Sequence, residues 1–363
     1  MSINLPPSSL PRVVIAGGGF AGLKLAQALD SSLFQIVLID HHNYHQFPPL
    51  IYQVASSGLE PSSIAFPFRA AFKRKKNFIF RLANVIGVEP EQKQLITSVG
   101  EVPYDYLVLA CGGTTNYFGN EQVAKHSLPM KTLYESMNLR NVLLQNIEKA
   151  LVSDNPETRE ALLTVVIVGG GPSGVEIAGA LAEMKRYVLP KDYPYMETDQ
   201  FKIHLIDASP RLLQAMSEKS SRTAAEGLSS LGVEIHHNTM VTDYDGRVLT
   251  LGDGTKMNTR TVIWVSGIVA NTVEGIQADS LGRGKRILVD GYNEVQGVPD
   301  VFALGDQCLM TADPAYPQGH PQMAQVAIQQ AALLAKNLKA RLTGAKQQTF
   351  RYKDLGSMAT IGR

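Results

Sequence analysis

Residues 13–28 read VVIAGGGFAGLKLAQA, and this stretch decides the fold. Four small apolar residues predict a buried strand that leads into Gly17, Gly19 and Gly22, and the apolar spacing that follows predicts a helix packed on a sheet. The first glycine permits a tight turn, the second lets backbone N–H groups approach a pyrophosphate, and the third lets the helix pack closely on the strand. The helix N-terminus adds unpaired N–H donors and the positive end of its dipole. Asp40 ends the next predicted strand, QIVLID, where its carboxylate suits a ribose diol.

The same pattern recurs in residues 161–183, ALLTVVIVGGGPSGVEIAGALAE. Here Gly169, Gly171 and Gly174 take the places of the first three glycines, and the strand FKIHLIDAS ends in Asp207. A closing strand follows each copy, YDYLVLACGG after the first and RTVIWVSG after the second. An internal duplication of this length predicts an α/β chain with two Rossmann-like dinucleotide-binding domains.

Composition limits the class of protein. A chain of 363 residues is too long for one core, and 44% hydrophobic residues is ordinary for a soluble globular protein. A net charge of +1 argues against nucleic acid as the main partner. Cys111 and Cys308 lie far apart, so we interpret them as small buried residues in a reducing compartment. The N-terminus lacks the features of a secretion signal, and the longest apolar run, 161–184, is interrupted by glycines and therefore predicts a strand, a turn and a helix.

Two dinucleotide-binding domains in one chain suggest hydride transfer between a flavin and a nicotinamide. Asp306 ends the strand DVFALGD, where it suits the ribityl chain of FAD, and the helix predicted at 322–342 can direct its N-terminus at the flavin ring. Because this strand completes the first sheet from the far end of the sequence, the NAD domain is expected to be inserted into the FAD domain. The expected division is a tail at 1–11, an FAD-binding domain at 12–120 and 290–345, a connecting helix in 121–154, an NAD-binding domain at 155–289, and the start of a further region at 346–363.

Several further elements are expected from the pattern. Helices are predicted at 134–152 and 218–231, turns at Asp245-Gly246 and Asp253-Gly254, and the beginning of a strand at GSMATIGR. The long connection at 41–69 is rich in aromatic residues and proline, which favours packing against something, such as a ligand. The basic run at 73–76 is interpreted as a solvated helix end, and the alternative is a patch that faces a membrane or an acidic partner.

No metal site is predicted. His41, His42 and His45 are not joined by cysteines or carboxylates at ligand spacing, so this loop is expected to lie beside an adenosine. His236 and His237 are adjacent on a predicted strand and therefore point to opposite faces.

Motifs spread over nearly the whole chain carry a family resemblance: NYHQFPPLIYQVASSGL, VVIVGGGPSGVEIAGALAEM, VFALGDQ, MAQVAIQQA and GSMATIGR. The chain resembles the two-dinucleotide-binding-domain flavoproteins with a pyridine nucleotide-disulfide reductase-like fold, and within them the type II NADH:quinone oxidoreductases. The glycine loops indicate only the superfamily. The AQxAxQ pattern from Ala324 to Gln329 is the narrower sign, because this family places its quinone near that helix.

The resemblance implies a role for each matching position. It assigns FAD binding to Gly17, Gly18, Gly19, Phe20, Ala21, Gly22, Asp40, His41, His42, Val85, Ala110, Gly112, Gly305, Asp306, Ala324 and Gln325. It assigns NADH binding to Gly169, Gly171, Pro172, Ser173, Gly174, Asp207 and Gly267. Glu176 corresponds to the family glutamate between nicotinamide and flavin, and Gln325 and Gln329 would flank the quinone. Each has a simpler interpretation: a glutamate in the first turn of a helix is favoured by the dipole alone, and glutamines are common on exposed helix faces.

The implied activity is non-proton-pumping electron transfer from NADH through FAD to a membrane quinone. Asp207 favours NADH, since it accepts a ribose 2′-OH and repels a 2′-phosphate, although Arg211 nearby could partly tolerate phosphate. Without a cysteine pair, disulfide reduction and sulfide oxidation are excluded. Two alternatives stay open: a soluble NAD(P)H-dependent flavoprotein reductase acting on ferredoxin, oxygen or peroxide, and a non-catalytic nicotinamide-sensing flavoprotein.

The family continues beyond GxMATIGR into a C-terminal region that binds the membrane. We therefore expect a truncated chain that behaves as soluble, from a parent protein peripheral to the cytoplasmic face of the membrane. The resemblance leaves a homodimer open.

Overall fold

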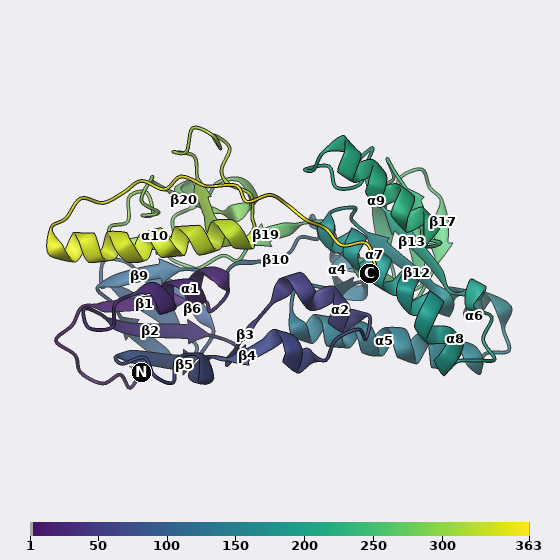
Figure 1. Cartoon of the computed structure of the whole chain (residues 1–363), viewed down its shortest axis with the longest axis horizontal. Coiled ribbons are helices and arrows are strands. Elements are labelled where there is room, and N and C mark those ends of the chain that lie inside the picture. Colours follow the sequence, from purple (N-terminus) through teal and green to yellow (C-terminus); the bar gives the residue numbers. More distant parts are fainter. Residues whose placement is uncertain (1–2, 363) are drawn as a thin grey trace. The chain divides into compact units, whose positions relative to one another are not determined.

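The structure is a computed structural model that describes residues 3–362, and its chain divides into two compact units (Figure 1). Of the described residues, the first unit comprises those up to Gln46, Phe66–Thr114 and Val269–Leu355, and the second comprises Phe47–Ala65, Thr115–Ile268 and those from Gly356 onward. Each unit is built on a parallel sheet covered by helices, which confirms the predicted α/β class.

The sheet of the first unit is parallel throughout. Its strand order is β21 (Val301–Ala303), β9 (Tyr106–Leu109), β1 (Arg12–Ala16), β2 (Gln35–Asp40) and β5 (Phe78–Leu82). Side chains of a strand alternate between the two faces of its sheet. Here the residues on both faces are apolar, as is usual for a parallel sheet covered on both sides. Val13 and Ile15 pack in one core with α1 (Phe20–Ala28), α3 (Phe68–Ala71) and α10 (Ala324–Thr343). Val14 and Ala16 pack in another with the meander β6 (Val85–Glu89), β7 (Gln94–Thr97) and β8 (Gly100–Pro103).

Shorter elements complete the first unit. They are β20 (Ile287–Val289), β22 (Cys308–Met310) and the 3₁₀ turns η5 (Ala278–Ser280), η6 (Arg283–Lys285) and η7 (Gly305–Gln307). The pairs β3 (Tyr44–Gln46) with β4 (Ala65–Pro67) and β10 (Gly113–Thr115) with β19 (Ile268–Ala270) occur where the chain passes from one unit to the other.

The basic run at 73–76 has a structural role that the sequence did not reveal. The Lys75 ammonium donates to the carbonyls of Gln27 and Leu29 at 3.0 and 2.8 Å, at the C-terminal end of α1. A cation there satisfies carbonyls that the helix leaves unpaired. Lys73, Arg74 and Lys76 are exposed just after α3, as a solvated helix end requires. Lys75 is the exception: it is partly buried, and burial lowers its pKa.

The second unit repeats the arrangement of the first. Its sheet order is β11 (Leu128–Pro129), β18 (Thr261–Trp264), β12 (Thr164–Val168), β13 (Lys202–Ile206) and β14 (Glu234–His236), all parallel. The meander β15 (Val241–Tyr244), β16 (Val248–Leu251) and β17 (Lys256–Asn258) contributes Tyr244 and Leu249 to a core that also holds Val166. The carboxylate of Asp245 accepts the N–H groups of Arg247 and Val248, which confirms the turn predicted there.

Helices cover the rest of the second unit. They are α2 (Ile51–Ala55), α4 (Glu121–His126), α5 (Leu133–Leu151), α6 (Pro156–Leu163), α7 (Pro172–Glu183), α8 (Leu189–Asp192) and α9 (Glu218–Ser230), with the short turns η1 (Pro48–Leu50), η2 (Pro61–Ile64), η3 (Met184–Val188) and η4 (Thr198–Gln200). The predictions of α5, α9 and α10 are confirmed to within two residues at each end. α5 begins with a capping box formed by Thr132 and Glu135, which satisfies N–H groups at its N-terminus.

The long connection at 41–69 divides between the two units. Its middle part, 47–65, belongs to the second unit, although the sequence analysis assigned it to the FAD domain. The reason is the apolar helix α2, whose Ile51 and Val54 are fully buried or nearly so. α2 packs against α5 and α7, so the apolar content of the connection is explained by packing on protein.

The described part of the C-terminal segment, 356–362, contains no strand, so the prediction of one at GSMATIGR is wrong. The segment lies along α7 instead, as Figure 1 shows in yellow. A Cβ built on Gly179 of α7 would come within 2.8 Å of the Gly362 nitrogen, so the missing side chain makes room for this backbone. Within residues 3–362, none of the helices has the length and apolar character needed to cross a membrane.

Candidate functional site

The glycine loop after β1 leaves open space at the N-terminus of α1. Gly17 has φ +102°, and a Cβ there would collide with the carbonyl of Ala110. A Cβ on Gly22 would collide with the carbonyl of Gly17, so this glycine permits close packing of α1 on β1. A Cβ on Gly19 would meet nothing within 4 Å. The empty volume therefore lies where the sequence predicts a pyrophosphate, in front of the N-terminus of α1.

The loop after β12 has the same geometry in the second unit. Gly169 has φ +120°, and a Cβ there would lie 2.7 Å from the Val265 carbonyl oxygen. A Cβ on Gly174 would collide with the Gly169 carbonyl, and one on Gly171 would meet nothing within 4 Å. Pro172 opens α7 as its first residue, where its missing N–H costs nothing, and Ser173 is exposed beside it. Each unit thus fits one dinucleotide.

An acidic residue ends the second strand of each unit and holds the glycine loop. Asp40 Oδ2 accepts the Gly18 N–H at 2.6 Å, and its Oδ1 accepts the His42 N–H at 2.7 Å. Asp207 repeats both contacts with the N–H groups of Gly170 and Ser209. Each carboxylate oxygen keeps acceptor capacity for a sugar hydroxyl, so the expected ribose contact is compatible with this geometry.

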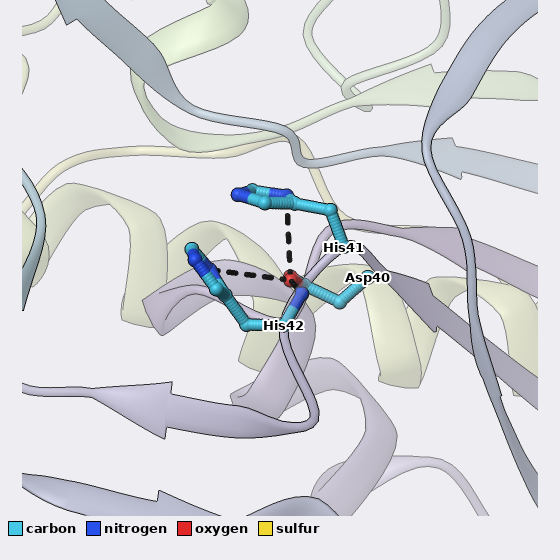
Figure 2. A group of neighbouring side chains, drawn as sticks. All are labelled: Asp40, His41 and His42. Atoms are coloured by element: carbon cyan, nitrogen blue, oxygen red, sulfur yellow. Dashed lines mark hydrogen bonds and ion pairs between the residues drawn. The ribbon is translucent and has the colours of Figure 1, made fainter. Parts of the chain in front are cut away.

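Two histidines extend the Asp40 site (Figure 2). His41 Nδ1 and His42 Nδ1 lie 3.5 and 3.9 Å from Asp40 Oδ1, so a carboxylate does join these histidines, contrary to the reasoning from spacing. Burial, and then the neighbouring His41, lower the pKa of His42, while Asp40 works in the opposite direction. This group lies next to the first glycine loop, since Asp40 also accepts the Gly18 N–H.

His45 also contacts the first glycine loop, which was not predicted from the sequence. Its Nδ1 lies 3.0 Å from the Gly18 carbonyl oxygen, and its ring stacks edge-on against Phe20 with centroids 5.5 Å apart. Val85 begins β6 close to Asp40, because the Ala83 N–H, two residues earlier, donates to the Asp40 carbonyl at 3.0 Å, and its contact with an adenine stays a prediction. Only the cluster of histidines at 41–45 hinted at these contacts.

The loop after β21 joins the glycine loop at the carboxyl ends of the strands. Gly305 has φ +64°, and a Cβ there would lie 3.7 Å from the Ala21 Cβ and 3.2 Å from the Ala327 Cβ. This places Asp306 in η7, between the beginnings of α1 and α10. Ala110 and Gly112 follow β9 at the same edge, and Gly112, at φ +67°, has open space around it.

Two buried glutamines fix this loop, and neither was identified from the sequence. Gln307 Oε1 accepts the Cys111 N–H at 2.6 Å, and Gln330 Oε1 accepts the Gly305 N–H at 2.8 Å. Both are at most 1% exposed. The AQxAxQ pattern drew attention to Gln329, whereas the residue after it, Gln330, is the one that holds the loop carrying Asp306.

Gln325 and Gln329 both bind the segment that follows α10. Gln325 Oε1 accepts the Tyr352 hydroxyl at 2.9 Å and the Leu355 N–H at 3.2 Å. Gln329 exchanges two hydrogen bonds with the backbone of Lys353, at 2.8 and 3.0 Å. Ala324 begins α10 one residue before Gln325. The two glutamines lie one helical turn apart, as expected, and both hold residues 352–355 against the helix.

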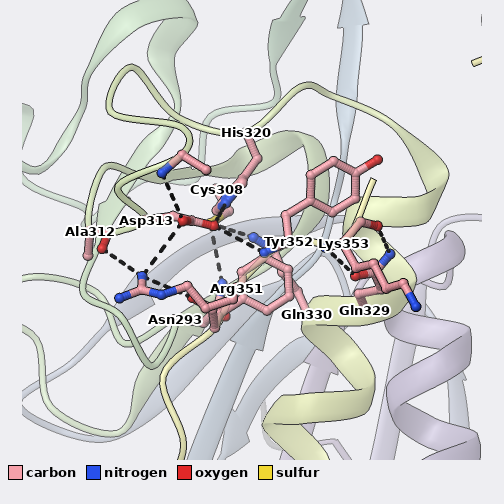
Figure 3. Close-up of polar contacts among 12 residues, drawn as sticks. Asn293, Cys308, Ala312, Asp313, His320, Gln329, Gln330, Arg351, Tyr352 and Lys353 are labelled. Carbon is pink, nitrogen blue, oxygen red and sulfur yellow. Dashed lines mark hydrogen bonds and ion pairs between the residues drawn. The ribbon is translucent and has the colours of Figure 1, made fainter. Parts of the chain in front are cut away.

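A buried acid–base pair, Asp313 and His320, binds the backbone of Tyr352 (Figure 3). Asp313 Oδ2 lies 3.0 Å from His320 Nε2 and accepts the Tyr352 N–H at 3.1 Å. Burial opposes the charge of Asp313, but the hydrogen bonds from His320, Tyr352 and Ala315 together hold its pKa below the ordinary value. The pair lies in a Pro-rich loop that has no helical or strand period from which it could be predicted.

Glu176 lies in the second turn of α7 and is half-buried. α7 begins at Pro172 and its first turn contains no acidic residue, so the simpler interpretation of Glu176 as a first-turn helix residue is wrong. Burial raises the pKa of Glu176 to about 7, and the Thr360 backbone N–H works in the opposite direction. A carboxyl group with such a pKa exchanges a proton near neutral pH.

Gly267 also lies in the second unit. Its carbonyl oxygen accepts the Asn116 N–H at 3.0 Å.

The burial predicted for the cysteines is confirmed for Cys308 and only partly for Cys111. Cys308 is buried and Cys111 is partly buried, and both are free thiols. Burial raises the pKa of Cys111 to about 12 and that of Cys308 to about 11. Thiols held neutral in this way are poor nucleophiles, so the two cysteines do not supply a disulfide chemistry.

Comparison with known proteins identifies the family. Residues 11–331 match the family described as pyridine nucleotide-disulphide oxidoreductase. The chain is 35% identical to the type II NADH:quinone oxidoreductase Ndh of Mycobacterium tuberculosis, over 100% of this chain and 81% of that protein. It is 33% identical to NdhA of the same organism, over 97% of this chain and 77% of that protein.

A solved structure shares the fold. NDH2 from Plasmodium falciparum, in complex with NADH, superposes with a TM-score of 0.89 at 21% identity, over 97% of this chain and 88% of that chain. This confirms the expected fold, and the sequence matches confirm the narrower resemblance. The chain therefore belongs to the pyridine nucleotide-disulphide oxidoreductases and, within them, to the type II NADH:quinone oxidoreductases.

Proposed function

We propose that this chain is an FAD-dependent enzyme that oxidises NADH and passes two electrons to a membrane quinone without pumping protons. The observation that carries the proposal is the repeated cradle, in which Gly19 and Gly171 each border open space at a helix N-terminus. Two dinucleotides on one chain suit electron transfer between them, and the curated relatives are NADH:quinone oxidoreductases by name.

The first unit would hold FAD. Gly17–Gly22 would bind the pyrophosphate, Asp40 the ribose of the adenosine, and Asp306 the ribityl chain. The positive end of α10, beginning at Ala324, would favour negative charge on the ring. When bound, a flavin supplies a ring that takes a hydride from a nicotinamide and returns two electrons to a quinone.

The second unit would bind NADH in preference to NADPH. Asp207 presents a carboxylate at the end of β13, where a 2′-phosphate would be repelled. Arg211 could have offset this repulsion, but its guanidinium donates to the carbonyls of Met216 and Gln214 at 3.1 and 2.8 Å. An arginine engaged in this way offers little to a phosphate, which strengthens the expectation of NADH.

Glu176 is the residue we assign to the nicotinamide side, where its raised pKa suits proton exchange near neutral pH. Gln325 and Gln329 would flank the quinone, and Tyr352 would orient the Gln325 amide. A quinone acceptor dissolved in lipid requires the protein to work at a membrane surface as a peripheral protein. A homodimer stays a prediction.

The test supplies purified protein with NADH and, separately, a short-chain quinone, ferredoxin or air alone. We expect one FAD for each chain and rapid turnover with the quinone only. Turnover with ferredoxin or air at the quinone rate would favour the reductase alternative. Flavin reduction by NADH without turnover on any acceptor would favour the sensor.

A further inference from the structure

Three side chains with metal-ligating atoms meet at the edge of the second unit's sheet. His204 lies on β13, and Glu234 and His236 lie two residues apart on the edge strand β14. His204 is the register partner of Glu234. Because partners in a sheet share a face and alternate residues of a strand do too, all three side chains project from the same face. Proximity in sequence could not reveal this group, since His204 is far from the other two.

Two distances within this group match those between neighbouring ligand atoms of a tetrahedral metal site. His204 Nδ1 lies 3.2 Å from His236 Nε2 and 3.4 Å from Glu234 Oε2, and all three atoms lie within 4.8 Å of one another. Around a tetrahedral Zn²⁺ with ligand bonds of about 2.0–2.1 Å, neighbouring ligand atoms are about 3.3 Å apart. The Glu234 side chain is 61% exposed, so it has room to adjust to an ion.

The electrostatics of the group also suit a dication. Burial is the main cause that lowers the pKa of His204, the His236 charge adds to it, and Glu234 works in the opposite direction. An imidazole binds a metal through a ring nitrogen that carries no proton, and the Glu234 carboxylate, 3.4 Å from His204 Nδ1, supplies negative charge to the group. Lys202, on the same strand, is paired with Glu160 at 2.6 Å, so a carboxylate already balances its charge.

We propose that His204, Glu234 and His236 bind a divalent transition-metal ion, for which Zn²⁺ is the best fit. The donor set is two imidazoles and one carboxylate, which leaves a fourth position for water. The ion would tie the edge strand β14 to β13. It would also lie close to the coenzyme site, because the Asp207 N–H donates to the His236 carbonyl at 2.9 Å.

The experiment titrates the full chain, as purified with its flavin, with Zn²⁺ in a calorimeter and with Co²⁺ while recording visible absorption. We expect one strongly bound Zn²⁺ for each chain and Co²⁺ bands of a low-coordinate nitrogen–oxygen site. His236→Gln should weaken Zn²⁺ binding by more than about tenfold. His237→Gln is the matched control, because it removes the adjacent histidine, which is outside the group, and should leave the affinity unchanged.

Glu234→Gln covers the case in which His236→Gln fails to fold, since Glu234 is exposed and the change is nearly isosteric. It should also weaken Zn²⁺ binding, with circular dichroism unchanged. The proposal is overturned if the wild-type chain takes up no equivalent of Zn²⁺. Equal affinity in the wild type, His236→Gln, Glu234→Gln and His237→Gln would overturn it too.

Discussion

The backbone N–H of Thr360 faces the carboxylate of Glu176 within the second unit. The segment that carries Thr360 reaches α7 because Gly179 has no side chain, so a single small residue brings an amide to the carboxylate. Even with this amide, burial keeps the pKa of Glu176 at about 7. The carboxyl is therefore close to half-protonated at neutral pH.

The first prediction concerns the pH dependence of stability. Glu176 has a folded-state pKa of about 7 against an ordinary value of 4.5, so the folded chain binds the extra proton between these values. The free energy of unfolding therefore falls as the pH rises from 4.5 to 7, because the buried group must then ionise. Glu176→Gln cannot ionise and should be more stable than the wild type at pH 8, by about 1–2 kcal/mol, since solvent screening of this partly exposed group reduces the full effect of the pKa difference.

Urea unfolding of both proteins at pH 5 and at pH 8 measures this difference. The advantage of the variant should be small at pH 5 and large at pH 8. Glu157→Gln is the control, since Glu157 is exposed in the first turn of α6 and should show no such pH-dependent gain. An equal difference for Glu176→Gln at both pH values would contradict the prediction.

The second prediction separates two glycines of the same loop. A Cβ on Gly171 meets nothing within 4 Å, and its φ of −73° suits alanine, so Gly171→Ala should fold normally. Its methyl group would occupy the space meant for the pyrophosphate, and the KM for NADH should rise by about tenfold or more. Gly174→Ala should instead lower the Tm, because its methyl group collides with the Gly169 carbonyl. If a folded Gly171→Ala variant has an unchanged KM for NADH, the coenzyme pyrophosphate does not bind at this loop.

The two glycine loops were predictable because the local backbone conformation requires the residue type found at each position. Gly17 and Gly169 need positive φ, and the acids Asp40 and Asp207 follow at strand ends where the pattern is strong. Such demands are visible in a short stretch of sequence. The duplication then predicted two Rossmann-like domains, since the same unit occurs twice, and the two parallel sheets confirm the α/β class.

Contacts between distant segments were not predictable. His45 reaches Gly18 from the three-residue strand β3, and Asp313 reaches Tyr352 across a Pro-rich loop, so neither contact could be predicted from a helical or strand period in the sequence. GSMATIGR looked like a strand because its composition is compatible with one. The segment packs against helix α7 and not against a strand, since Gly179 of α7 has no side chain and leaves room for the backbone of the segment.

The third prediction is the choice of coenzyme. Asp207 disfavours a 2′-phosphate, and Arg211 is engaged with backbone carbonyls, so the wild-type kcat/KM should be at least about tenfold higher with NADH than with NADPH. Steady-state assays with each coenzyme and the same quinone measure the ratio. Arg211→Gln should leave this ratio unchanged if the arginine is engaged as observed. A comparable kcat/KM for the two coenzymes would contradict the assignment of Asp207.

The last prediction concerns the hydroxyl of Tyr352. It donates to Gln325 Oε1 at 2.9 Å, and burial raises the pKa of the hydroxyl, so it stays a neutral donor at physiological pH. Tyr352→Phe removes one hydrogen bond, worth about 1 kcal/mol, and leaves the Gln325 amide less well oriented. The KM for quinone should therefore rise about fivefold, while the rate of flavin reduction by NADH stays the same.

Stopped-flow reduction by NADH and steady-state titration with a short-chain quinone separate these two effects. Tyr316→Phe is the matched control, because its ring lies 5.3 Å from that of Tyr352 and the change keeps this aromatic contact. If both variants raise the KM for quinone equally, loss of packing in the loop explains the result and the hydrogen bond to Gln325 does not orient it. If only Tyr352→Phe does so, Gln325 acts on the quinone in the orientation that Tyr352 imposes.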